Sequence, residues 1–439
     1  MRKNRSIGTL TATMAWLALV GAAADAPLTA ADKRAIVEET GRAIEANYVF
    51  PDKAKTIAAT LRDNLGKGDY DAVTGKAALA RELSEDLVAA SNDLHFAVGV
   101  DPGWVADYQA SKDPVRAAAI RERERRDEAR ANFGFDAVQR LDGNIGYVRF
   151  SHFADPELAY DTAAAVMRFI EGSDAVIFDL RYNNGGHLEM AQLLASQLFP
   201  GDRDQELFDY YYSKDGRRVD RGQWVLPALP AKRLTGKPVY VLLGSTSFSA
   251  AEWFAYTLQK LGRATIVGER SAGGAHPVDR WPVGTDLFVQ IPFGQIRDPV
   301  DRGDFEGHGV VPDHQVASVD ALDVAHRLAL SELAKADPGK QADADWFAPV
   351  LAMRARPRAT TLKAVTGRYE GRRIDLVDGK LLYTWRERFR LALEPLGGDL
   401  FAIEGVQDFR FRMARKNGKV IALERINRDG TTQSYARID

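Results

Sequence analysis

Apolar strands alternate with helices across the middle of the chain, and this alternation constrains the fold more than any other feature. Apolar runs at 175–178 and 239–243 are typical of strands buried on both faces, and residues 264–267 are predicted to form a further strand. Strands that alternate with helices are joined by right-handed crossovers and pack in layers. Residues 142–335 are therefore predicted to form an α/β core. The other elements expected in it are a strand at 145–150 and helices at 156–170, 188–198, 250–261 and 321–333.

The flanking segments have different patterns. Residues 25–100 have helical periodicity with breaks at Pro51 and Gly66–Gly68, which predicts a helical N-terminal domain. Charges of both signs alternate within 101–141, which favours a solvated connecting helix. Residues 336–355 are rich in Ala, Asp, Lys and Pro and are predicted to be a linker. Short strands in 356–439 predict a small antiparallel β domain, with hairpin turns at Asp378-Gly379, Asn417-Gly418 and Asp429-Gly430.

The N-terminus has the pattern of a secretory signal peptide. Arg2, Lys3 and Arg5 precede an apolar, uncharged stretch, Met14–Ala24. That stretch is shorter than the roughly 20 residues needed to span a bilayer, and small residues follow at which cleavage is expected, after Ala24 or Ala26. We expect residues 1–24 to be removed and the protein to be exported, to a periplasm or beyond. No later segment is long and apolar enough to span a membrane.

Composition excludes several classes of function. The chain has no cysteine, so thiol nucleophiles, thiolate metal sites and disulfides are impossible. The 59 basic and 61 acidic residues nearly balance, so no nucleic-acid partner is expected. His187 and Glu189 form a His-x-Glu pair, but the cysteines of a zinc deaminase are missing. No metal or other cofactor is predicted.

Three glycine-containing loops follow predicted strands, where α/β folds place their sites. They span 179–187, 244–252 and 304–313. In the second loop Ser249 stands at the start of a helix, where N–H groups stabilise negative charge. Ser249 and Glu252 also fit a capping box, which is a purely structural alternative. A serine nucleophile needs a base, and spacing alone cannot choose among the seven histidines.

Taken together, these loops resemble the C-terminal-processing (tail-specific) serine peptidase family, in particular the branch of the tricorn core and the interphotoreceptor retinoid-binding protein modules. The resemblance covers about residues 30–333. It implies a layered α/β core of the crotonase/ClpP-like type beside the helical domain. The matching segments are 47–54, 93–95, 143–147, 179–186, 248–252, 263–269 and 306–313.

The resemblance also implies roles for individual residues. Ser249 matches the nucleophile, His95 the general base and Glu306 the late glutamate of the tricorn-like branch. The oxyanion hole would be formed by Ala250 and the Gly185-Gly186 turn, with Gly186 as the preferred donor.

Two positions depart from patterns found in the family. The tail-specific branch has a lysine base 25 residues after the serine, and this chain has Gly274 there, so a serine–lysine mechanism is excluded. The tricorn core has a serine directly before its histidine, and this chain has Leu94. Glu306 must then reach His95 directly, or through water or another hydroxyl, or the relay is weakened.

The predicted function is that of an exported serine peptidase that cleaves peptide bonds in peptide or protein substrates through an acyl-enzyme on Ser249. The alternative is a non-catalytic exported protein that binds an apolar, retinoid-like or lipid-like ligand on the same fold. A third possibility is that the C-terminal β domain binds a partner. The sequence does not determine the oligomeric state.

Overall fold

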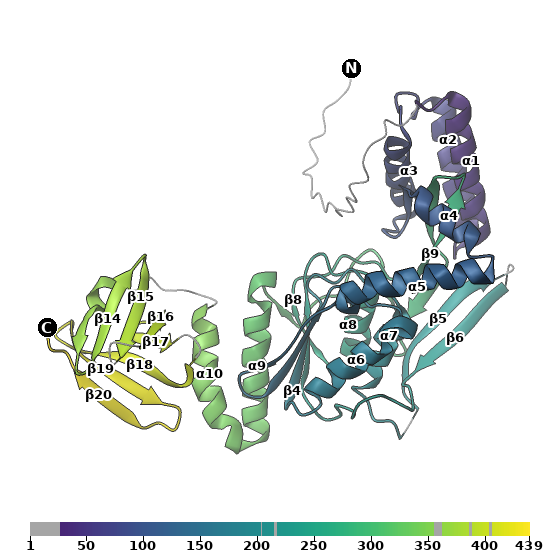
Figure 1. Cartoon of the computed structure of the whole chain (residues 1–439). Coiled ribbons are helices and arrows are strands. Elements are labelled where there is room, and N and C mark those ends of the chain that lie inside the picture. Colours follow the sequence, from purple (N-terminus) through teal and green to yellow (C-terminus); the bar gives the residue numbers. More distant parts are fainter. Residues whose placement is uncertain (1–26, 203, 215–216, 355–361, 386–388, 404–405) are drawn as a thin grey trace. The chain divides into compact units, whose positions relative to one another are not determined.

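The computed structural model describes residues 27–439 except 203, 215–216, 355–361, 386–388 and 404–405 (Figure 1). The predicted signal peptide therefore lies outside the described residues. The chain divides into two compact units. Residues 140–146 and 173–177 belong with 319–439 in the second unit, and the other residues up to 318 form the first.

The helical domain predicted at the N-terminus is present. The helices α1 (Ala30–Asn47), α2 (Pro51–Lys67) and α3 (Lys76–Ser91) pack on one another around a shared apolar core. A capping box between Thr29 and Asp32 starts α1. Asn92 ends α3 in the left-handed conformation (φ 58°) and so redirects the chain. The segment that follows α3 contains His95, so this helix end decides where that side chain lies.

A small antiparallel sheet adjoins these helices. Its strand order is β1 (Ala97–Val100), β10 (Leu287–Pro292), β9 (Val278–Val283). Residues of β9 and β10 share the apolar core of α1–α3, so chain segments almost 200 residues apart meet here. The segment predicted as one connecting helix contains α4 (Pro102–Ala110), α5 (Pro114–Arg130) and the short η1 (Asn132–Gly134). No residue of α5 is buried, as expected for a solvated helix.

The α/β class is confirmed by a six-stranded sheet. Its order is β12 (His314–Gln315), β8 (Thr265–Gly268), β7 (Val239–Leu243), β4 (Ala175–Asp179), β3 (Ile145–Phe150), β2 (Phe135–Leu141). Every residue of β4 and β7 is buried, as the continuous apolar runs predict. The helices α6 (Pro156–Ile170), α7 (Leu188–Ser196) and α8 (Ala250–Lys260) alternate with these strands.

A second three-stranded sheet joins β11 (Gly294–Arg297), β5 (Glu206–Lys214) and β6 (Arg217–Trp224). The sequence pattern predicted no strands here. The pairing is antiparallel throughout, with Tyr210 opposite both Ile296 and Arg221. These strands contribute part of the wall of the cavity described below.

The second unit contains two helices and a sheet. The short η2 (Ser318–Asp320) precedes the helix α9 (Ala321–Ala336). The short η3 (Pro338–Lys340) and the helix α10 (Gln341–Arg354) follow it. The linker predicted at 336–355 thus contains a helix. Ala344, Phe347 and Leu351 are buried at helical spacing, a short apolar stripe that the Ala-, Asp- and Lys-rich composition concealed.

The predicted antiparallel β domain forms one eight-stranded sheet in sequence order from β13 to β20, preceded by η4 (Leu362–Val365). The three predicted turns each join neighbouring strands, and Asp378 and Asn417 have positive φ as type I′ turns require. The strands are β13 (Gly367–Tyr369), β14 (Arg372–Val377), β15 (Lys380–Trp385), β16 (Phe389–Gly397), β17 (Leu400–Ile403), β18 (Val406–Lys416), β19 (Lys419–Asn427) and β20 (Thr432–Ala436).

Among the described residues, no helix has both the length and the apolar character needed to cross a membrane.

Candidate active site

Ser249 lies between the carboxyl end of β7 and the first residue of α8. Its backbone has φ 56° and ψ −121°, a conformation that residues other than glycine rarely adopt. Such strain persists only where the surroundings enforce it, and it is concentrated at functional sites. The Ser249 N–H donates a hydrogen bond to Glu252 Oε2 (2.9 Å), so Glu252 has the capping role that the sequence suggested.

The Gly185-Gly186 turn lies against Ser249. Both glycines have positive φ, 100° and 125°. A Cβ on Gly185 would lie 2.7 Å from Ser249 Cβ and 3.1 Å from the Ala250 nitrogen, so only glycine allows this approach. The Gly185 N–H donates to Asn183 Oδ1 (2.9 Å). The N–H groups of Gly186 and Ala250 form no hydrogen bond with any described residue, and both residues line one cavity with Ser249.

Arg181 braces the start of this turn. Its guanidinium donates two hydrogen bonds to the buried carboxylate of Asp179 (2.6 and 2.8 Å) and one to the Ser318 carbonyl (2.7 Å). Tyr147 donates to the same carboxylate (2.7 Å). The charges of this pair are therefore satisfied within the fold, which agrees with a structural rather than a substrate-binding role.

Glu252 is fully buried and holds two loops together. Its carboxylate accepts hydrogen bonds from Ser271 Oγ (2.6 Å), from the N–H groups of Gly273 (2.6 Å) and Gly274 (2.9 Å), and from Ser249. Burial raises the pKa of Glu252 to about 7, and the four donors oppose that rise. Because three of the donors are backbone N–H groups, which cannot accept, the geometry suits the carboxylate form.

His95 is 2% exposed and lies beside the residue that precedes Ser249. Its ring stacks on Phe248, with 4.5 Å between ring centroids. Neither ring nitrogen has a hydrogen-bond partner in the described part of the chain, a rare condition for a buried histidine. Burial lowers the pKa of His95, which favours the neutral ring that a general base requires.

Gly274 explains how a histidine fits at this place. A Cβ on Gly274 would come 2.3 Å from the Phe248 ring and 2.6 Å from Cε1 of His95. A side chain at Gly274 would therefore occupy the space of the His95 ring. Glycine at the position where the tail-specific branch has lysine is thus a steric condition for the histidine arrangement.

The carboxylate next to His95 belongs to Asp93. Its Oδ1 accepts a hydrogen bond from the His95 backbone N–H (3.0 Å) and lies 3.7 Å from the ring nitrogen Nδ1, beyond hydrogen-bond distance. Its Oδ2 accepts from Nδ1 of the buried His276 (2.6 Å). Burial alone would raise the pKa of Asp93, but the hydrogen bond with His276 and the charges of the two neighbouring histidines hold it below the usual range.

Glu306 lies next to His276. Its Oε2 is 3.6 Å from His276 Nδ1 and accepts a hydrogen bond from the Ala275 N–H (2.6 Å). Burial, reinforced by the charge of Asp93, raises the pKa of Glu306 to about 7. Burial alone would lower the pKa of His276, but Asp93 and Glu306 raise it. No contact joins Glu306 to His95 in the described residues, so the two are linked through His276 and Asp93.

Asp93 and His276 are the members of this cluster that sequence reasoning did not select. Asp93 stands two residues before His95, and His276 two residues after Gly274. The sequence did offer one signal for Asp93. A carboxylate two residues before a proposed base can accept a hydrogen bond from the backbone N–H of that base, as Asp93 does from His95. Leu94, the departure from the tricorn pattern, is 43% exposed, whereas Asp93 and His95 on either side of it are 2% exposed.

Asp93, His276 and Glu306 each offer a possible metal ligand. Within the part of the chain that the structure describes, these ligand atoms all lie within 4.8 Å of one another. The potential ligand atoms Oδ2 of Asp93 and Nδ1 of His276 are, however, hydrogen-bonded to each other (2.6 Å), so each has a partner without an ion.

A cavity of about 470 Å³ opens beside Ser249. Its wall combines Gly186 and His187, the start of α8 and strands of the β5–β6–β11 sheet. Four aromatic side chains line it, and polar groups stand among them. The aromatic residues are Phe208, Tyr210, Trp253 and Phe293, and the polar ones include Glu189, Gln192, Arg221 and Gln223.

Comparison with known proteins shows what the chain is similar to. Residues 144–316 match the model for peptidase family S41, and residues 22–132 match the model described as the N-terminal domain of peptidase S41 in eukaryotic IRBP. Two consecutive segments of the chain are thus similar to domains of one family of proteolytic enzymes, which confirms the resemblance inferred from its loops.

Curated relatives are named carboxyl-terminal-processing proteases. The chain is 26% identical over 175 residues to a carboxyl-terminal-processing protease of Synechocystis and 27% identical over 207 residues to that of Picosynechococcus. These alignments cover 39% and 46% of this chain and 38% and 46% of the relatives, so the chain spans less than half the length of each. A solved structure of the photosystem II D1 C-terminal processing protease is also similar (TM-score 0.40, 14% identity, 66% of this chain and 93% of that one).

Proposed function

We propose that this protein is an exported serine peptidase whose nucleophile is Ser249. The observation that carries the proposal is a strained serine at a helix N-terminus whose preceding residue, Phe248, contacts a buried histidine with no ring-nitrogen partner in the described residues. A purely structural serine cap would need neither feature. The S41 domain match and the named relatives support a peptidase over the alternative of a non-catalytic binding protein.

In the proposed mechanism, the neutral ring of His95 takes the proton from Ser249 Oγ as that oxygen attacks the scissile carbonyl. The N–H groups of Ala250 and Gly186 donate to the oxyanion that forms. Removal of one such donor typically costs about 2.7–4 kcal/mol of transition-state stabilisation. His95 then protonates the leaving amine, and the acyl-enzyme on Ser249 is hydrolysed by water.

Asp93 is proposed to hold and stabilise the imidazolium of His95. Glu306 acts indirectly, as a positioning residue, because it contacts His276 rather than His95. This replaces the direct or hydroxyl-mediated link between Glu306 and His95 that the sequence suggested. The relay does not need a serine at position 94, since Asp93 is already at the base.

The proposed substrates are peptide chains. The cavity beside Ser249 is large enough for one amino-acid side chain, and its aromatic wall favours an apolar one. Export rests on the signal pattern in residues 1–24, and N-terminal sequencing of the protein recovered from outside the cytoplasm tests it. A mature chain that begins at Asp25 or Pro27 is expected.

Hydrolysis of an unstructured protein by the mature chain, followed by mass spectrometry of the products, tests the activity. Ser249→Ala and His95→Ala are expected to abolish cleavage. The matched control is His308→Ala, because His308 is exposed and its ring nitrogen Nδ1 lies 2.9 Å from the backbone carbonyl oxygen of Glu306 rather than against a side chain of the site. Undiminished cleavage by His95→Ala would remove the base assignment, and cleavage by Ser249→Ala would remove the nucleophile.

A further inference from the structure

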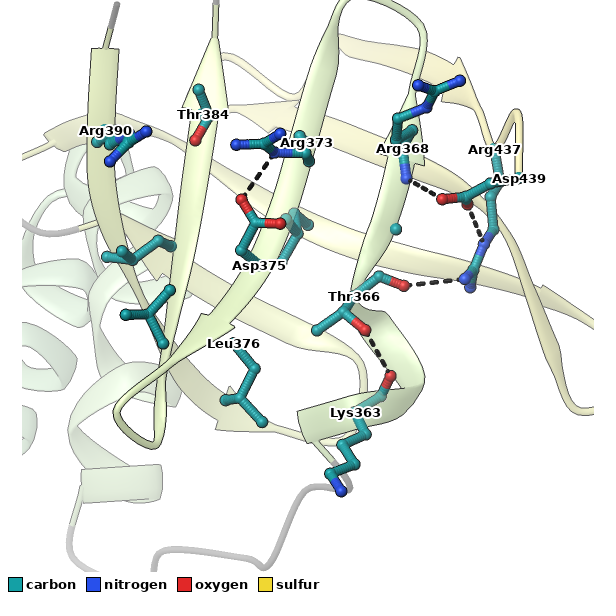
Figure 2. A pocket seen from close by; sticks show the side chains of 14 residues that line it. Lys363, Thr366, Arg368, Arg373, Asp375, Leu376, Thr384, Arg390, Arg437 and Asp439 are labelled. Atoms are coloured by element: carbon teal, nitrogen blue, oxygen red, sulfur yellow. Dashed lines mark hydrogen bonds and ion pairs between the residues drawn. The ribbon is translucent and has the colours of Figure 1, made fainter. Parts of the chain in front are cut away.

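The C-terminal β domain contains a pocket of about 900 Å³ that has no part in the proposed catalysis (Figure 2). It lies on strands β13–β16 and the segments next to them. Five basic side chains line it and only two acidic ones. The basic residues are Lys363, Arg368, Arg373, Arg390 and Arg437, and the acidic ones are Asp375 and Asp439.

A row of cross-strand neighbours forms the basic side of the pocket. Arg368 pairs with Arg373, Arg373 with Thr384, and Thr384 with Arg390, on four successive strands. Directly opposed residues point to the same face of a sheet, and Figure 2 shows these four side chains in line. Neighbouring strands are about 4.8 Å apart. Like charges so close destabilise a sheet unless something of opposite charge lies between them.

Ion pairs within the fold neutralise only part of the positive charge of the pocket. Arg373 donates to Asp375 (2.7 Å), and Arg437 pairs with Asp439 (3.0 Å). The guanidinium groups of Arg368 and Arg390 form no ion pair or hydrogen bond with any residue in the described ranges.

Thr384 supplies an independent observation between the arginines. It is 7% exposed, yet its Oγ1 has no hydrogen-bond partner among the described residues. A buried hydroxyl without a partner costs about 1–3 kcal/mol. A hydroxyl in this state, flanked by Arg373 and Arg390, is placed to donate to an oxyanion held by them.

The pocket also has an apolar side. Leu382 precedes Thr384 by two residues and so points to the same face, about 6.8 Å further along β15. Val377, which is 45% exposed, and Leu376 line the pocket as well. Figure 2 shows Leu376 set apart from the arginine row. Charge and apolar surface are therefore segregated within one pocket.

We propose that this pocket binds a small amphipathic oxyanion, a phosphonate-, phosphate- or carboxylate-bearing molecule with an apolar substituent. The guanidinium groups of Arg368, Arg373 and Arg390 bind the oxyanion, because their planar forks match its oxygens. The Thr384 hydroxyl donates to it, and the apolar substituent packs on Leu382. This site is independent of Ser249 and of the proposed peptidase activity.

Titration calorimetry of the full mature chain with phenylphosphonate tests the proposal. Saturable binding is expected, at least about fivefold tighter than that of inorganic phosphate, which lacks the apolar group. The double variant Arg368→Gln/Arg390→Gln should weaken binding at least about tenfold, since hydrogen bonds to charged groups are strong. Arg412→Gln is the matched control, because Arg412 is an exposed arginine of β18 paired with Glu424 and lies outside the pocket.

Thr384→Val keeps the shape of the side chain and removes only the hydroxyl, so it tests the site even if the double variant does not fold. About threefold weaker binding is expected. Absence of saturable heat, or equal affinity of the double variant and wild type, would overturn the proposal. So would retention of the protein on phosphatidylglycerol vesicles without binding of free phenylphosphonate, because that result would assign the arginine row to a membrane surface.

Discussion

Replacing Asp93 by Asn separates the proposed relay from a simple serine–histidine pair. The carboxylate lies 3.7 Å from His95 Nδ1 in a site where both side chains are 2% exposed. At an effective dielectric constant of about 20, one negative charge at that distance stabilises an imidazolium by roughly 4.5 kcal/mol. That energy corresponds to a factor on the order of 10³ in rate. Because His276 already offsets part of the charge, we expect kcat/KM of Asp93→Asn to fall about 10²–10³-fold.

The assay must separate lost catalysis from lost structure. Asp93 also accepts the hydrogen bond of His276, and breaking a buried pair can cost about 3–5 kcal/mol of stability. Peptide hydrolysis and urea unfolding are therefore measured on the same preparations. Asp86→Asn serves as control: Asp86 lies on α3 of the same helical domain, and its carboxylate accepts hydrogen bonds from Tyr70 and Asn64. It should lose stability and keep its activity per folded molecule.

A folded Asp93→Asn protein with wild-type kcat/KM would refute the reasoning, because the carboxylate would then contribute nothing to the imidazolium. A fall in kcat/KM equal to that of Asp86→Asn would refute it as well.

Three further predictions follow from the geometry around Ser249. Gly185→Ala should lower kcat/KM at least about 100-fold, since its Cβ would press on Ser249, whereas Gly172→Ala, with open space around it, should not; equal activities would contradict this. Glu252→Gln should lower the free energy of unfolding by about 2–4 kcal/mol in urea titrations. The N–H₂ group of glutamine cannot accept the hydrogen bonds that backbone N–H groups donate to the carboxylate. Unchanged stability would argue against the four-donor arrangement. His276→Asn should move the acid limb of kcat/KM to higher pH. The variant lacks the positive charge of His276, which lowers the pKa of His95 and offsets the charge of Asp93. The pKa of His95 therefore rises, and His95 becomes protonated at a higher pH. A limb that stays in place or moves to lower pH would contradict the proposed coupling.

Much of the fold was predictable because burial leaves a direct record in the sequence. The fully buried strands β4 and β7 appear as uninterrupted apolar runs. The hairpin turns at Asp378 and Asn417 appear as Asp-Gly and Asn-Gly pairs. The helix α10 was missed because its buried stripe is short, with Ala344, Phe347, Val350 and Leu351 as its buried apolar members among the described residues.

The site was less predictable, because its distinguishing features are geometric. A capping serine and a strained serine have the same sequence, and the positive φ of Ser249 appears only in the structure. His95 could be selected among seven histidines only through family resemblance. Its relation to Gly274 depends on a contact between segments almost 180 residues apart. Asp93 and His276 meet across a similar separation, which spacing cannot reveal.

Labelling with a fluorophosphonate probe tests the central claim most directly. Such probes form a covalent bond with serines activated as nucleophiles, so the mature protein should acquire one adduct, located by peptide mass spectrometry on Ser249. Ser249→Ala should remove the adduct, and His95→Ala should slow its formation strongly. An unlabelled folded protein, or an adduct that persists unchanged in Ser249→Ala, would contradict the assignment of Ser249 as the nucleophile.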